Sequence, residues 1–161
     1  MIVDKAPAAA VFAAYLLTSA AGAAAAAKDP FVGTWKLNTT KSEFEGGTPP
    51  KSSVATITPA GGNKRRLVVH TVPASGPEMT TESTAADDGK DYPMKGSPTV
   101  DTVSVIRLDD RTIERRDKKN GRVVATLRAT VSADGKTMTI VQRGATPQGG
   151  TYTNTLLYDR Q

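Results

Sequence analysis

Short runs of alternating apolar and polar residues recur along most of the chain. An extended strand places successive side chains on opposite faces, so such runs are typical of strands with one buried face. The clearest run carries its apolar side chains at every second position, at Val123, Ala125, Leu127, Ala129 and Val131. The alternation therefore predicts half-buried strands, and no helical period of useful length competes with it after the first segment.

Nine runs rich in Val, Thr and Ile are predicted as strands. They span residues 31–37, 53–59, 64–72, 78–85, 99–108, 111–118, 122–132, 136–143 and 151–159, with a possible short tenth at 92–94. Between the first two, glycine and proline pairs interrupt regular structure, and residues 42–45 fit one turn of helix.

Tight turns join many of these runs. Asn120-Gly121, Asp134-Gly135, Asp109-Asp110 and Asp88-Gly89 are dipeptides typical of short hairpin reversals. Strands joined so closely must be antiparallel, which gives an up-and-down meander. We therefore expect an all-β fold of about 8–10 strands, closed into a barrel because closure removes the sheet edges. The inward residues are small on average, which favours an internal cavity.

The N-terminal segment has a different composition. Residues 1–27 combine an early lysine, an apolar stretch and a run of alanines, the layout of a cleaved secretory signal peptide. The predicted domain is then 28–161, exported to the periplasm or the outside. The sequence has no cysteine and a formal net charge of +5. That charge suits an anionic ligand, an anionic membrane or nucleic acid, or simply keeps the protein soluble.

Few residues indicate catalysis or metal binding. His70 is the sole histidine, so a multi-histidine metal site is excluded, and it is expected in the core or at a barrel end. Residues 87–91 resemble a calcium loop but lack its ligand spacing, and a hairpin turn is the simpler interpretation. We expect no catalytic residues, no metal and no cofactor. The basic pairs lack interleaved aromatic residues, so we expect no nucleic-acid partner.

The first strand resembles that of the calycins, the group that holds lipocalins and fatty-acid-binding proteins. The resemblance rests on Gly33-Thr34-Trp35 in the first strand and on Tyr158 and Arg160 at the end of the last. The chain also resembles a bacterial lipocalin-like family. It implies a barrel closed by Gly33, Trp35, Tyr158 and Arg160, with the arginine against the tryptophan ring. The segment 38–53 is too short and too rich in Gly and Pro for a two-helix lid.

The resemblance and the alternation together predict binding of a small hydrophobic or anionic amphipathic ligand inside the barrel. The expected lining is Leu67, Val69, Met79, Val103, Val105, Leu127, Met138, Ile140, Tyr152 and Leu156, with Val54 or Ile57. One inward arginine, Arg65 or Arg115, is a candidate anion anchor. The alternative is a barrel with a filled core that acts through its loops, as an envelope protein-interaction or inhibitor module. An enzyme would need titratable groups that converge inside, for example His70 with an aspartate.

Overall fold

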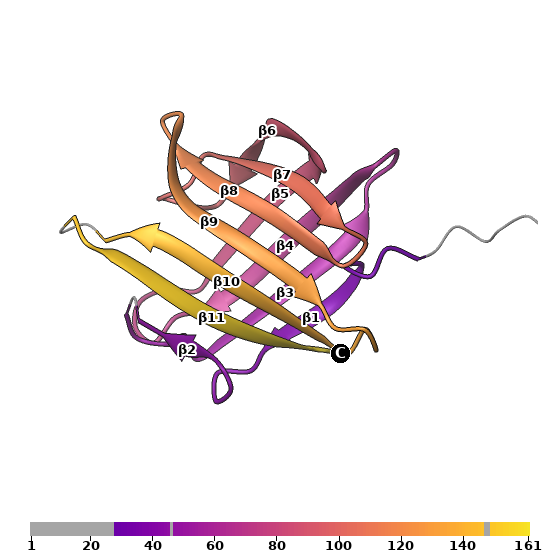
Figure 1. Ribbon diagram of the computed structural model, residues 1–161. Helices are drawn as coiled ribbons and strands as arrows, with labels where there is room; N and C mark the ends of the chain where they lie inside the picture. The colour runs from indigo at the N-terminus through magenta and orange to yellow at the C-terminus, as the bar shows by residue number, and fades with distance from the viewer. Residues whose placement is uncertain (1–27, 46, 147–148) are drawn as a thin grey trace, which may run out of the picture.

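The computed structural model describes residues 28–45, 47–146 and 149–161, and in these ranges all regular secondary structure is β-strand (Figure 1). The predicted signal peptide, residues 1–27, lies outside the described residues. The strands are β1 (Gly33–Leu37), β2 (Glu43–Phe44), β3 (Ser52–Pro59), β4 (Lys64–Val72), β5 (Met79–Ala86), β6 (Asp88–Lys95), β7 (Thr102–Asp109), β8 (Thr112–Lys119), β9 (Arg122–Val131), β10 (Thr137–Ala145) and β11 (Thr151–Arg160).

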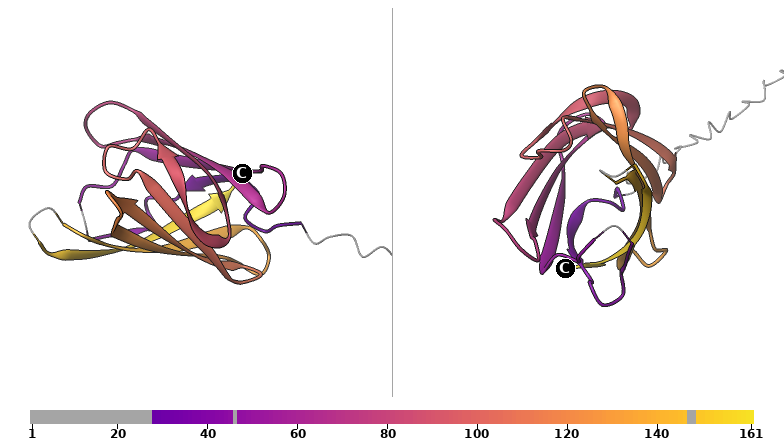
Figure 2. Two further views of the ribbon diagram at one scale, coloured as in Figure 1. Left: turned by 90° about the horizontal axis from the view of Figure 1, so that it is seen from above. Right: turned by 90° about the vertical axis from the view of Figure 1, so that its left-hand side faces the viewer.

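Ten of these strands form a closed antiparallel barrel. From β3 to β11 each strand pairs with the next, and β1 pairs with both β3 and β11, so the sheet has no open end (Figure 2, right). The short β2 adds to β11 beyond the end of β1. The predicted all-β meander barrel is confirmed. Among the described residues, no helix has the length and apolar character needed to cross a membrane.

One local prediction was wrong. The segment 42–45 is not a turn of helix, because Glu43 and Phe44 pair with β11 and satisfy backbone groups that β1 does not reach. The predicted Asp88-Gly89 reversal agrees with the register of β5 and β6, in which Glu82 lies opposite Lys95 and Ser83 lies opposite Met94. Gly89 has a positive φ of 74° there, and the register of β6 with β7 shifts between Asp88 and Asp91.

The β8–β9 hairpin follows its sequence signal closely. Asn120 and Gly121 have φ angles of 51° and 74°, both in the left-handed region that two-residue hairpins of this type require. Asn120 is also the only non-glycine residue with a positive φ among the described residues. The turn therefore sets the antiparallel pairing of β8 and β9 at low steric cost.

The sole tryptophan lies at the closed end of the barrel beneath an arginine. Trp35 is fully buried, and the guanidinium carbon of Arg160 lies 4.1 Å from its ring centroid. Arg160 also donates hydrogen bonds to three carbonyl oxygens, of Gly135 (2.5 Å), Val32 (2.7 Å) and Pro30 (2.5 Å). A Cβ at Gly33 would collide with this guanidinium. One cation thus joins the last strand to the segment before β1 and to the β9–β10 turn.

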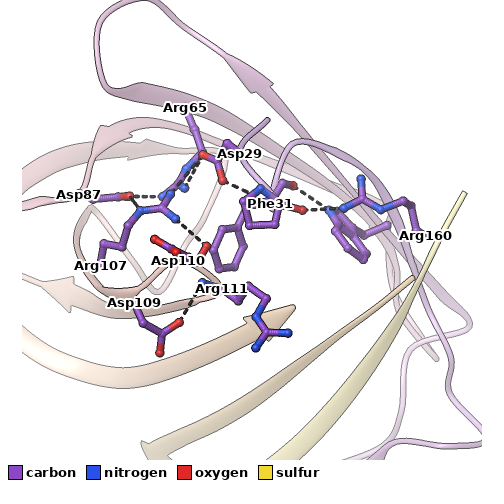
Figure 3. Close-up of polar contacts among 11 residues, drawn as sticks. Asp29, Phe31, Arg65, Asp87, Arg107, Asp109, Asp110, Arg111 and Arg160 are labelled. Atoms are coloured by element: carbon purple, nitrogen blue, oxygen red, sulfur yellow. Dashed lines mark hydrogen bonds and ion pairs between the residues drawn. The ribbon is translucent and has the colours of Figure 1, made fainter. Parts of the chain in front are cut away.

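A second aromatic residue closes the same end beside an ion-pair cluster (Figure 3). Phe31 is fully buried, and the guanidinium carbons of Arg65 and Arg107 lie 5.2 and 5.4 Å from its ring centroid. The carboxylate of Asp29 accepts hydrogen bonds from both arginines, at 2.9 and 3.2 Å, and from the Phe31 amide at 3.1 Å. Asp87 pairs with the same two arginines. These contacts fix residues 29–31 across the barrel end.

Replacing Arg160 tests the first of these contacts. Arg160→Met should lower the free energy of unfolding by at least about 3 kcal/mol, because three carbonyls lose a charged donor and Trp35 loses its cation. Urea unfolding followed by Trp35 fluorescence measures the change. Arg128→Met is the control, since Arg128 is exposed on the outer face of β9. A loss at position 160 no larger than at the control would contradict the assigned role.

Asp29 should make stability depend on pH. Burial opposes its ionisation, but the Phe31 amide and the two arginines outweigh this and hold the pKa of Asp29 below its ordinary value. Its contribution is therefore present above the unfolded-state pKa of about 3.9 and is lost as the pH falls through the lower folded-state pKa. Asp29→Asn should be less stable than wild type at neutral pH, and the difference should shrink below about pH 4.

The measurement is a series of urea titrations from acid to neutral pH on both proteins. Asp110→Asn is the control, because Asp110 is exposed and contributes only its backbone carbonyl to the neighbouring Arg107. It should follow the wild type at every pH. A constant difference between wild type and Asp29→Asn would show that ionisation of Asp29 does not stabilise this end.

Candidate functional site

The barrel encloses a cavity of about 360 Å³. Its wall is mainly apolar, with Phe31, Ala55, Ile57, Leu67, Val69, Met79, Met94, Val100, Ile113, Leu127, Ala129, Met138, Ile140 and Leu156. The polar lining residues are Thr81, Ser97, Thr99, Arg115, Asp117, Gln142 and Tyr158. Most of these side chains come from inward positions of the strands, and three come from the β6–β7 connection.

The cavity approaches solvent at the end opposite Trp35. Met79, at the start of β5, lines the cavity and is 38% exposed. Ser97, Thr99 and Val100 of the β6–β7 connection line the same region. The fully buried Phe31 bounds the cavity toward the closed end. A ligand would therefore enter past Met79 and this connection.

Seven of the ten predicted lining residues face this cavity: Leu67, Val69, Met79, Leu127, Met138, Ile140 and Leu156. Val103 and Val105 line a smaller cavity of about 60 Å³, which shares Phe31, Ile57 and Leu67 among other wall residues with the main one. Of the alternatives Val54 and Ile57, Ile57 lines the wall. The structure thus brings nine of the ten side chains together around two adjoining spaces.

Tyr152 is the exception, because its ring covers a glycine on the neighbouring strand. Gly144 pairs with Tyr152 in the β10–β11 ladder, and a Cβ at Gly144 would lie 2.6–2.8 Å from the tyrosine ring and hydroxyl. Burial, with a smaller contribution from the negative charge of Asp117, raises the pKa of the Tyr152 hydroxyl. Tyr152 therefore packs along the wall near the mouth and does not line the main cavity.

An ion pair lies within the mainly apolar wall. Arg115 and Asp117 are two positions apart on β8, so both side chains point inward. Nε of Arg115 donates to Oδ1 of Asp117 at 2.5 Å, and the two side chains are only 17% and 9% exposed. Arg115 was one of the two candidate anion anchors, whereas Asp117 was not anticipated. Its position in phase with Arg115 and Ile113 was the available signal.

Tyr158 brings a hydroxyl to the same wall. It is buried, and this burial raises the pKa of its hydroxyl against the opposing effects of Ser53 and the positive charge of Arg115. Tyr158 belongs to the same buried cluster as Trp35, Phe31 and Met138. The tyrosine predicted to close the barrel thus also faces the cavity.

The other candidate anchor, Arg65, is already paired. It binds Asp29 and Asp87 at the closed end, as described above. Arg66 and Arg116, which directly follow the two candidate anchors, face outward, where Arg66 pairs with Glu82 and Arg116 with Glu114. Arg115 is therefore the cation that faces the main cavity.

The remaining candidate residues lie outside the cavity. His70 is not in the core but lies near the mouth end of the barrel, two positions before β4 ends. Its side chain is 48% exposed on the outer face of β4, near Thr80 (3.0 Å) and Glu78 (3.3 Å). Outward orientation follows from its pairing register, because Leu67 and Val69 occupy the inward phase. His70 and an aspartate therefore do not converge inside.

The aspartates of the acidic stretch 87–91 pair with other side chains of the same chain. Asp87 pairs with arginines, Asp88 accepts a hydrogen bond from the Tyr92 hydroxyl at 2.9 Å, and Asp91 pairs with Lys118 at 2.6 Å. Within the described parts of the chain, no three Asp, Glu, His or Cys side chains gather as metal ligands would. Each aspartate in this stretch thus has a structural partner on another residue.

Comparison with known proteins identifies the fold. No protein-family description matches the chain, and no curated protein is similar to it in sequence. Among solved structures, the barrel is similar to a point mutant of the fluorescent protein UnaG, with a TM-score of 0.56 and 15% identity over 82% of this chain and 96% of that chain. At this identity the likeness concerns the fold alone. The likeness agrees with the antiparallel β-barrel predicted from the sequence.

The contact between Gly144 and Tyr152 gives a testable coupling. Gly144→Ala should destabilise the barrel by about 1–3 kcal/mol, because the new methyl group displaces the tyrosine ring. In a Tyr152→Ala background the same change should cost much less. A double-mutant cycle by urea unfolding measures the coupling. Equal costs in the two backgrounds would show that the ring does not constrain position 144.

Proposed function

We propose that this protein binds a small hydrophobic or amphipathic molecule non-covalently inside the barrel. The observation that carries the proposal is the mainly apolar cavity of about 360 Å³ with access past Met79. Ligand pockets in proteins are concave, mainly apolar and carry a few polar groups that set orientation. This cavity has that composition, and burial of an apolar ligand in it would be favoured by the hydrophobic effect.

The volume limits the size of the ligand. A water molecule occupies about 30 Å³ of liquid, so the cavity holds about twelve groups of that size. A single medium-length alkyl chain or a small ring system with one polar group fits this limit. Larger molecules would require the mouth connection at residues 96–101 to open or part of the ligand to remain in solvent.

A non-catalytic role is part of the proposal. The titratable groups nearest each other in the cavity are Arg115 and Asp117, and a guanidinium does not release its proton in proteins. The pair is therefore suited to holding a polar group and not to transferring a proton. The alternative, a filled barrel that binds other envelope proteins, predicts a core without such a cavity, so the cavity supports the ligand-binding role.

We also propose that the protein acts after export, in the periplasm or outside the cell. The sequence of residues 1–27 supports this proposal. Removal of those residues would leave Asp29 and Phe31, which fix the closed end, in the mature chain. N-terminal sequencing of protein recovered from the exported fraction should begin at Lys28.

The ligand-binding proposal predicts that a hydrophobic molecule accompanies the purified protein. Native mass spectrometry of the exported protein, followed by organic extraction, should detect such a molecule. Val69→Trp should abolish or strongly reduce its retention, because Val69 lines the cavity and the larger ring takes ligand space. Val68→Trp is the matched control, since Val68 precedes it on β4 and faces outward.

Thermal unfolding of both variants checks that they are folded. Retention by Val68→Trp but not by Val69→Trp places the ligand inside the barrel. Equal retention by the two variants would place it on the surface and contradict the proposal. An empty wild-type protein that also fails to bind added alkyl compounds would contradict it as well.

A further inference from the structure

We propose that the Arg115–Asp117 pair makes the cavity select an uncharged polar group that both donates and accepts hydrogen bonds, such as a primary amide, over a carboxylate. This inference rests on the proposed function, because it assumes that the cavity holds a ligand. It concerns which chemical class of ligand the cavity takes.

The pair presents both kinds of hydrogen-bonding group to the cavity. Asp117 accepts from Nε of Arg115, and both side chains line the main cavity. Among the described residues, the terminal nitrogens of Arg115 and Oδ2 of Asp117 have no hydrogen-bond partner. No unpaired side-chain nitrogen or oxygen in these parts of the chain is fully buried, so these atoms are not fully buried. They are therefore accessible from the cavity: two donor nitrogens beside one acceptor oxygen.

Charge balance distinguishes this site from a simple anion site. The guanidinium of Arg115 is already compensated by Asp117, whose side chain is only 9% exposed. Arg65, which lines the smaller cavity, is compensated by Asp29 and Asp87. A carboxylate placed against Arg115 would lose its hydration and lie close to a second negative charge, both of which are costly away from water.

A primary amide avoids that cost. Its carbonyl oxygen accepts from a terminal nitrogen of Arg115, while its NH₂ group donates to Oδ2 of Asp117. Both bonds involve a charged protein group, and such bonds are about twice as strong as neutral ones. The apolar part of the molecule then lies along side chains such as Leu127 and Ile140.

The test compares two compounds of equal length. Decanamide and decanoate each have about twelve non-hydrogen atoms, which matches the cavity volume. Isothermal titration calorimetry at about pH 8, where the carboxylic acid is ionised, measures both dissociation constants. The wild type should bind decanamide at least tenfold more tightly than decanoate.

Asp117→Asn should remove this preference. The asparagine carbonyl can still accept from Nε of Arg115, but the negative charge is gone and the amide group offers a donor. Decanoate should then bind at least tenfold more tightly than it does to the wild type. Glu114→Gln removes one negative charge from the outer face of the same strand, where Glu114 pairs with Arg116. This control should keep the wild-type preference.

The outcomes separate the two proposals. Tighter binding of decanoate than of decanamide by the wild type overturns the selectivity and leaves the ligand-binding function intact. Binding of neither compound overturns the proposed function and this inference with it. If Asp117→Asn does not fold, the wild-type order alone decides. An equal gain in decanoate affinity for Glu114→Gln would assign the effect to overall charge and overturn the inference.

Discussion

The contact between Arg160 and Trp35 is the interaction on which the closed barrel depends. The guanidinium covers the face of a fully buried ring and donates to three backbone carbonyls. Those carbonyls belong to the segment before β1 and to the β9–β10 turn, so one side chain joins three parts of the chain. Gly33 is required beside it because any side chain there would occupy the space of the guanidinium. The seam of the barrel, where β1 pairs with β11, is thus fixed by the Arg160 guanidinium, which donates its hydrogen bonds to carbonyls of the protein itself.

The two ends of the barrel divide structural and binding roles. At the closed end, cations and carboxylates are paired with one another, with aromatic rings or with backbone carbonyls. Along the wall of the main cavity, Arg115 and Asp117 pair with each other but keep atoms that reach the interior space. Arginine is therefore used for stability at one end and, in our proposal, for recognition further along the same barrel. The difference lies in the number of partners that each guanidinium has within the chain.

Alternation along the chain, together with the short hairpin turns, was sufficient to predict the fold, and seven of the ten predicted lining residues face the main cavity. Because alternate residues of a strand share one face, inward positions such as Leu127 and Ile140 could be identified without any tertiary information. The position of a residue along the barrel axis could not be predicted in this way. Tyr152 is in the inward phase of its strand, but its ring lies on Gly144 and does not line the main cavity. Ion-pair partners far apart in the sequence could not be predicted either, because Asp29 and Asp87 meet Arg65 and Arg107 only in the folded barrel. The short β2 was missed because two residues carry no periodicity.

The seam also has a consequence for how the chain folds. Val32 and Arg160, which are joined by a hydrogen bond, are 128 positions apart in the sequence. Local hairpins such as the one at Asn120-Gly121 can form early, whereas pairing of β1 with β11 must wait until both are available and must overcome the entropy of closing a very long loop. Until then the sheet has two unpaired edges, which are surfaces for association with other chains. Closure is therefore expected to be the late, slow event of folding, and the interval before it the period in which the chain most needs protection from aggregation.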